Sequence, residues 1–120
     1  MEGFEPSGAR DVIWLGNSRK NLKEFPKEVQ KGLGGEIQKM QFGGMPEDAK
    51  PFNATGSGVF EIAIEYDTNA YRVVVAVKLG DKIYVLHAFQ KKSTKGIATQ
   101  KKDVDLIKER YRQAQRLSKS

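Results

Sequence analysis

The stretch VFEIAIEYDTNAYRVVVAVKLGDKIYVLHAF, residues 59–89, decides the fold of this chain. It contains three apolar segments, residues 59–66, 71–79 and 82–89, separated by short polar breaks. In the first two segments the side chains alternate between two faces, as in a half-buried strand, whereas the third is apolar on both faces, as in a central strand. Because both breaks are short, we expect an antiparallel meander of three strands.

The residues before this meander predict another strand and two helices. Residues 10–15 form a short apolar segment that Gly16 ends. Asn17 or Ser18 can then cap a short helix that reaches about residue 25, and Pro26 suits the first turn of a second helix. Apolar residues three or four positions apart give this second helix a buried stripe, formed by Val29, Leu33, Ile37 and Met40. Residues 43–58, rich in glycine and proline, are expected to be a loop.

After the meander, residues 99–117 are expected to form a basic helix. Its apolar stripe consists of Val104, Ile107, Tyr111 and Ala114. The whole pattern predicts a single domain over residues 1–120, an α+β fold of two layers. We expect an antiparallel sheet of about four strands, an N-terminal helical hairpin and a C-terminal helix. One sheet face would pack on the helices, and the other, with Glu61 and Arg72, would form an open polar groove.

The composition removes several kinds of chemistry. The chain has no cysteine and one histidine, so it cannot form disulfides or use a thiolate, and a histidine-rich zinc site is not expected. We therefore expect no metal and no cofactor. No apolar run approaches the ~20 residues of a membrane span, and the N-terminus does not resemble a signal peptide. A cytoplasmic protein is the default expectation.

Positive charge is concentrated at the C-terminal end. Residues 1–89 carry 11 Lys and Arg against 12 Asp and Glu, a balance of −1, whereas residues 90–120 carry 10 against 3, a balance of +7. Such a localised field attracts polyanions. A solvated basic helix face is the plain alternative.

The cations that follow the last strand are the first candidates for a site. Lys91, Lys92 and Lys95 come directly after an apolar strand, and Arg72 lies on the neighbouring strand, so they can converge on an RNA phosphate. RNA cleavage can proceed without metal, because the 2′-hydroxyl is the nucleophile and the protein supplies a base, an acid and donors to phosphate. Crowding by cations lowers a lysine pKa towards the range that proton transfer needs. The sequence leaves open which group is the base.

Each candidate also has a structural explanation that needs no function. The paired lysines can simply keep a strand edge soluble, and Arg72 can pair with Glu61 or Glu65 across the strands. His87 lies in a run that is apolar on both faces, so alternation does not orient it, and a core histidine is the commoner outcome. Lys50 stands alone in the loop, which favours a solvated side chain.

In this order, these segments resemble the RelE/HigB superfamily of bacterial toxins, and are most similar to its phage-derived HigB-like branch. The resemblance spans about residues 10–116 and is carried by Lys50-Pro51, Gly58–Ile62, Tyr71-Arg72, Leu86–Ser93 and Asp103–Arg116. It implies a type II toxin, an endoribonuclease (mRNA interferase) that cleaves mRNA, usually on the ribosome, and that a helix-turn-helix antitoxin neutralises.

The resemblance also implies roles for residues. Arg72 would bind the scissile phosphate, Lys91 and Lys92 would stabilise charge or transfer protons, and Lys50 would complete the basic cluster. His87 is a further catalytic candidate, and Lys95 a contact to RNA. Two alternatives to this hydrolase remain open: a non-catalytic nucleic-acid-binding module, and an inactive toxin relative that acts through complex formation.

Overall fold

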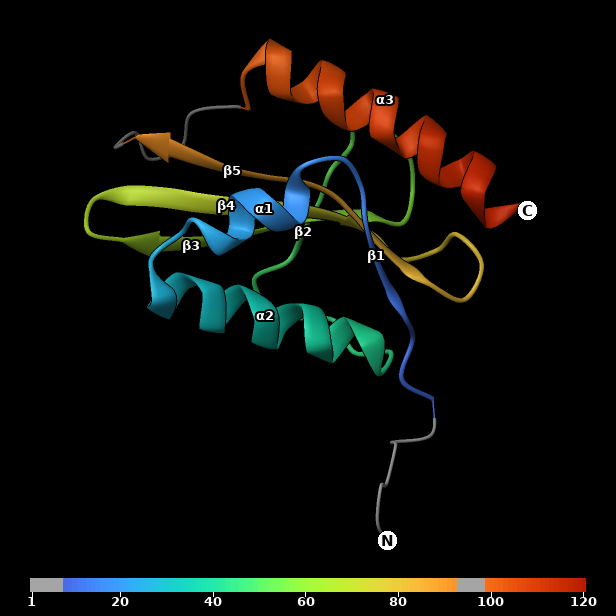
Figure 1. Ribbon diagram of the computed structural model, residues 1–120, viewed down its shortest axis with the longest axis horizontal. Helices are drawn as coiled ribbons and strands as arrows, with labels where there is room; N and C mark the ends of the chain where they lie inside the picture. Colours follow the sequence, from blue (N-terminus) through green and yellow to red (C-terminus); the bar gives the residue numbers. More distant parts are fainter. Residues whose placement is uncertain (1–7, 93–98) are drawn as a thin grey trace, which may run out of the picture.

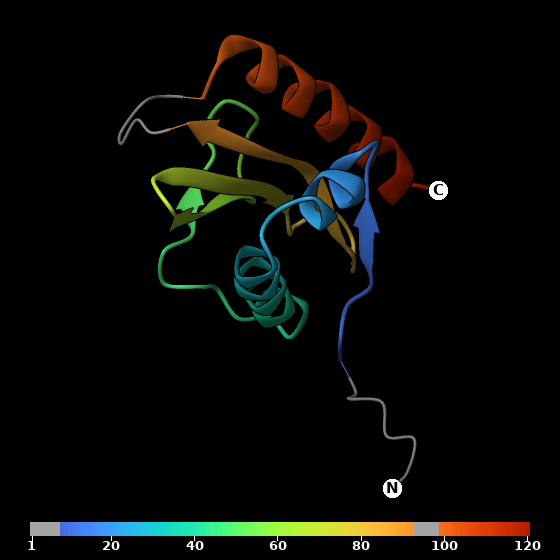
Figure 2. The ribbon, with the colours of Figure 1, turned by 60° about the vertical axis from the view of Figure 1, so that its left-hand side comes forward.

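The computed structural model describes residues 8–92 and 99–120. One sheet lies between helices on both of its faces, as Figures 1 and 2 show. In chain order the elements are β1 (Val12–Trp14), α1 (Ser18–Lys23), α2 (Lys27–Gln41), β2 (Lys50–Pro51), β3 (Val59–Tyr66), β4 (Asn69–Ala76), β5 (Ile83–Lys92) and α3 (Lys101–Ser118).

The meander forms as predicted. β3 pairs antiparallel with β4, and β4 pairs antiparallel with β5. Tyr66 pairs with Asn69, so Asp67 and Thr68 alone make the first turn, with φ of 53° and 66°. Two successive positive φ angles belong to the turn whose twist matches that of the flanking strands. This tight hairpin holds β3 and β4 in a single register, and that register places the side chains of Glu61 and Arg72 on the same face of the sheet.

The prediction of about four antiparallel strands is wrong. The sheet has five strands in the order β1-β5-β4-β3-β2, and it is mixed, because β1 runs parallel to β5. Val12 pairs with Ile83, about seventy residues further along the chain, and nothing local in a three-residue strand specifies so distant a partner. At the other edge, Lys50 pairs with Glu61 in the two-residue strand β2, which is too short to show a period.

The layer with α2 contains the predicted helical stripe. Val29, Leu33, Ile37 and Met40 are all buried against the sheet. Gly32 fits this contact, since a Cβ there would lie 2.5 Å from Cδ1 of Ile64. Close packing therefore accounts for one of the helix glycines.

A third layer replaces the predicted open face, so the two-layer prediction is also wrong. α3 packs across the other side of the sheet through Ile107 and Ala114, above Val74 and Leu86 (Figure 2). The physical reason lies in β5, whose residues are apolar on both faces and must be covered on both. This face is consequently covered by a helix and is not the open polar groove that was expected. Among the helices that the structure describes, none is long and apolar enough to cross a membrane.

Candidate functional site

A bulge in β5 determines where His87 points. Val74 pairs with His87 and Val75 pairs with Val85, so Leu86 is one residue more than β4 can match. A bulge of this kind interrupts the alternation of side chains along a strand. Leu86 packs under α3, and His87 also lies on that side, because its Nε2 is 2.9 Å from Oδ1 of Asp103 in α3. The orientation that alternation could not give is thus set by one extra residue.

The strand register brings most of the candidate residues to this same face. Residues that pair across antiparallel strands project to the same side of the sheet. Successive rows on the α3 side are Lys50–Glu61–Val74–His87, then Ala63–Arg72–Phe89, then Glu65–Ala70–Lys91. Four candidates from three strands therefore share one face, and two carboxylates, Glu61 and Glu65, stand among them.

Arg72 and Glu61 form the tightest polar contact of the site. Nη1 of Arg72 donates to Oε2 of Glu61 across 2.5 Å, and their side chains are only 15% and 17% exposed. The cross-strand pairing that the sequence offered as a structural explanation for Arg72 is therefore present. This pairing is compatible with a function for Arg72, because a guanidinium has five N–H donors and the bond to Glu61 uses one edge of it.

Lys91 is the buried cation of the cluster, with 8% of the residue exposed. Burial lowers the pKa of Lys91, and the neighbouring Arg72 lowers it further, whereas Glu61 and Asp103 act in the opposite direction. We expected crowding by other lysines to be the cause. The lowered pKa agrees with the direction of that expectation, with desolvation as the largest cause and Arg72 as a cationic neighbour. The side chain of Lys92 and the whole of Lys95 lie outside the described residues.

His87 joins the sheet to α3. Its ring stacks on that of Phe89, with centroids 4.7 Å apart and planes inclined by 16°, and its Nε2 meets Asp103. Burial lowers the pKa of His87, although the hydrogen bond to Asp103 works against that shift. The neutral imidazole is therefore favoured, and it is 5% exposed.

The unsatisfied polar atoms gather in this cluster. Within the described ranges, two buried side-chain atoms lack a hydrogen-bond partner, Nε of Arg72 and Nδ1 of His87. Such atoms are rare in folded proteins and call for a reason, of which a ligand or a catalytic task is one. Their occurrence on neighbouring rows of one sheet face marks this face as the candidate site.

The remaining candidates are placed less firmly. Lys50 is exposed at the sheet edge, opposite Glu61. The backbone of Lys92 ends β5, where it pairs with Asn69, but its side chain is outside the description, as is the whole of Lys95. The structure therefore brings Arg72, His87 and Lys91 onto one face with α3, and leaves Lys50 at its rim.

Two carboxylates of the site were missed as functional candidates. Glu61 was expected on the same face as Arg72 and as its possible ion-pair partner, but it was given no role in the chemistry. Asp103 gave no signal, since one acidic residue in a basic helix is unremarkable until the helix is placed over β5. No group of three or more His, Cys, Asp or Glu residues suited to a metal ion occurs in residues 8–92 and 99–120.

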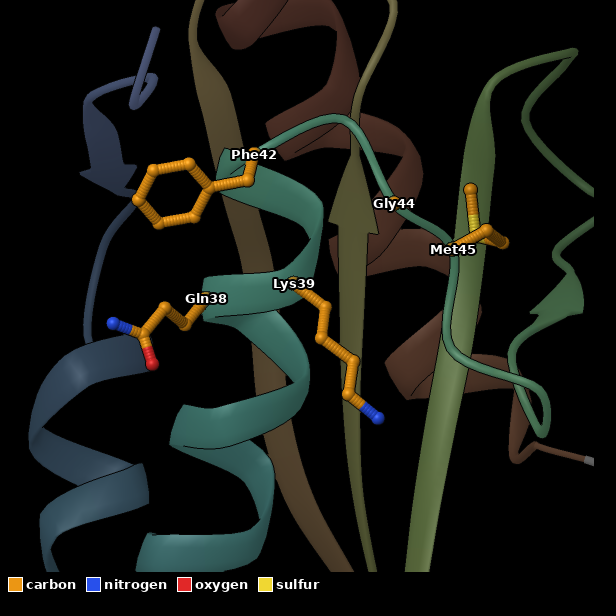
Figure 3. Close-up of a pocket in the computed structure, with 5 residues that line it drawn as sticks. All are labelled: Gln38, Lys39, Phe42, Gly44 and Met45. Atoms are coloured by element: carbon orange, nitrogen blue, oxygen red, sulfur yellow. The ribbon is translucent and has the colours of Figure 1, made fainter. Parts of the chain in front are cut away.

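A separate pocket lies at the end of α2, in a different layer from this cluster. It holds about 440 Å³ and is lined by Gln38, Lys39, Phe42, Gly44 and Met45 (Figure 3). Phe42 and Met45 are 49% and 47% exposed, which is unusual for side chains of this size. The pocket is lined by none of the candidate residues and is not part of the site.

These features define an α+β domain with a mixed five-stranded sheet, whose α3 face carries an arginine, a buried lysine and a histidine among carboxylates. Residues 20–112, more than half of the chain, match the family described as phage-derived protein Gp49-like (DUF891), and the chain belongs to that family. The family is typically of the RelE, toxin–antitoxin type. No curated protein and no solved structure gives a significant match.

Proposed function

We propose that this protein is a type II toxin of the HigB-like branch, a metal-independent endoribonuclease that cleaves mRNA on the ribosome. The observation that carries the proposal is the position of Arg72 and Lys91 on neighbouring rows of one sheet face, each influenced by Glu61. Membership of a family that is typically of the toxin–antitoxin type supports it independently.

The chemistry that we propose needs little more than these groups. The 2′-hydroxyl of the RNA attacks the adjacent phosphodiester, so the protein must neutralise charge on phosphate and move two protons. Arg72 offers a planar fork to the non-bridging oxygens. Lys91 adds a second positive charge beside it, and a lysine with a lowered pKa gives up its proton more readily than an ordinary lysine.

The ribosome and an antitoxin complete the proposal. A small face of this kind has few groups with which to hold an RNA strand in the geometry for in-line attack, and a ribosome presents mRNA already ordered. We propose a cytoplasmic protein that a helix-turn-helix antitoxin neutralises, as is usual for toxins of this superfamily. The site needs no small-molecule cofactor for this reaction.

A second candidate function is non-catalytic binding of nucleic acid. The observation that favours it is a set of six exposed cations along α3 and at its C-cap: Lys101, Lys102, Lys108, Arg112, Arg116 and Lys119. A binding module would use this face for phosphate contacts. Neutralising these residues would then weaken binding in a salt-dependent manner, and no RNA would be cleaved.

Induced expression in bacteria tests the proposed function. We expect the wild type to arrest growth and to generate new mRNA 5′ ends. Arg72→Ala should remove both effects, because the loss of one donor to the developing charge costs about 10²–10³ in rate. Arg112→Ala removes an exposed arginine of α3 whose side chain pairs with Glu109, and this matched control should behave as the wild type. Normal growth with soluble wild-type protein would contradict the proposal.

A further inference from the structure

We propose that Glu61 is the general base of this site, the group that takes the proton from the attacking 2′-hydroxyl. This inference rests on the proposed function and deepens it, because the sequence left the base unassigned. It follows from the contact between Glu61 and the arginine that is proposed to hold the phosphate.

The first argument is position. A general base must lie within about 3 Å of the proton that it removes, and the attacking hydroxyl is a neighbour of the scissile phosphate. A phosphate bound by Arg72 is therefore close to whatever else Arg72 contacts. Oε2 of Glu61 is 2.5 Å from Nη1 of that guanidinium, which places the carboxylate at the edge of the phosphate position.

The second argument is elimination among the groups that surround the site. Nδ1 of His87 is fully buried, so in this structure it does not reach a substrate atom. Asp103 bonds His87, whereas Glu61 bonds the arginine that is proposed to hold the phosphate. Lys50 at the sheet edge and Lys91 on β5 carry amino groups, whose ordinary ammonium form has three donors and no acceptor. Among the side chains that residues 8–92 and 99–120 place at this site, Glu61 is the acceptor in contact with Arg72.

The third argument is the balance of the reaction. The bond from O2′ to phosphorus forms as the bond from phosphorus to O5′ breaks. Glu61 receives the 2′-hydroxyl proton, and the Lys91 ammonium donates a proton to the departing O5′. The products are a 2′,3′-cyclic phosphate and a 5′-hydroxyl end, and the two residues return to their starting states by exchanging protons with solvent. No oxidant, reductant or further reactant is needed.

The test separates a base from a residue that only holds Arg72. Glu61→Gln keeps a carbonyl oxygen that accepts from Arg72 but removes the proton acceptor. Single-turnover cleavage of a defined mRNA on purified ribosomes is measured across pH, together with ribosome binding. We expect the variant to bind normally and to lose about 10²–10⁴ in rate, the usual contribution of general base catalysis. The fall in wild-type rate on the acid side, where the carboxylate is protonated, should be missing from its profile.

The controls distinguish the possible failures. Glu65→Gln removes a carboxylate from the same strand and the same face and should cleave at the wild-type rate. Glu61→Asp keeps the carboxylate, so it should retain the acid limb at a reduced rate even if the glutamine variant is poorly folded. Cleavage by a folded Glu61→Gln at nearly the wild-type rate would overturn the assignment while leaving the nuclease intact. An inactive wild type would overturn the proposed function and this assignment together.

Discussion

At the scale of single residues, the structural and the functional explanations of Arg72 turn out to share one geometry. The sequence allowed either a cross-strand ion pair or a phosphate ligand. The ion pair is present, yet Nε of the same guanidinium is buried with no partner, and the paired carboxylate is the proposed base. A residue whose charge is held by a neighbouring carboxylate is also oriented by it, and this preorganisation is what a phosphate site requires.

Lys91 provides a test at this scale, because burial lowers its pKa from an ordinary value of 10.5. Below that ordinary value, the unfolded chain holds this proton more firmly than the native protein does. The free energy of unfolding should therefore rise with pH between the lowered pKa of Lys91 in the native protein and about 10.5, its ordinary value in the unfolded chain. A lysine whose pKa is raised by an ion pair would show the opposite trend, because its contribution to the free energy of unfolding falls as the pH rises.

Lys91→Met removes the buried charge and keeps an unbranched side chain that is shorter by one atom. We expect the variant to lose cleavage while its Tm at pH 7 is at least that of the wild type. As the pH is raised towards 10, the wild type should gain stability relative to the variant. Thermal unfolding of both proteins at several pH values measures the difference between their Tm values. A clearly lower Tm of the variant at pH 7 would show that the charge stabilises the fold, contrary to the prediction.

At the scale of elements, the position of α3 over β5 depends on polar ties as well as on its apolar stripe. Arg110 donates to the carbonyl oxygen of Leu86 at 3.0 Å and to Oδ1 of Asn17 at 2.7 Å. It lies directly against Gly16, where a Cβ would be 2.4 Å from its Nη2 and where φ is +53°. One arginine thus joins the helix, the bulged strand and the turn before α1.

Arg110→Met should therefore lower the free energy of unfolding by about 2 kcal/mol, the usual cost of losing hydrogen bonds from a charged group, here one part-buried bond and one exposed bond. Arg116→Met, an exposed substitution in the same helix, should change it by less than about 0.5 kcal/mol. Urea denaturation of both variants measures the difference. Equal stabilities would mean that the apolar stripe alone holds α3 in place.

At the scale of the whole molecule, the elements that could be predicted are those specified by residues close together in the sequence. The meander of residues 59–89 and the stripe of α2 each repeat with their own period. α3 begins and ends within two residues of the prediction. The parallel pairing of Val12 with Ile83 and the short strand β2 depend on distant contacts, and no local period encodes these.

The site follows the same division. Arg72 and Lys91 could be predicted as neighbours because they lie on consecutive strands of a meander. The side of the sheet that His87 faces could not be predicted, because one extra residue at Leu86 reverses the alternation of side chains along β5. Asp103 joins the site only through the packing of α3, so its contribution is a product of the three-layer arrangement.

The measurement that bears most directly on the central claim is the chemistry of the RNA ends. Purified wild-type protein is added to ribosomes translating a defined mRNA, with Arg72→Ala and Arg112→Ala in parallel, and the fragments are mapped and their termini identified. We predict discrete cleavage with 2′,3′-cyclic phosphate and 5′-hydroxyl ends for the wild type and Arg112→Ala, and intact mRNA for Arg72→Ala. Intact mRNA in the presence of folded wild-type protein, or equal cleavage by folded Arg72→Ala, would contradict the account.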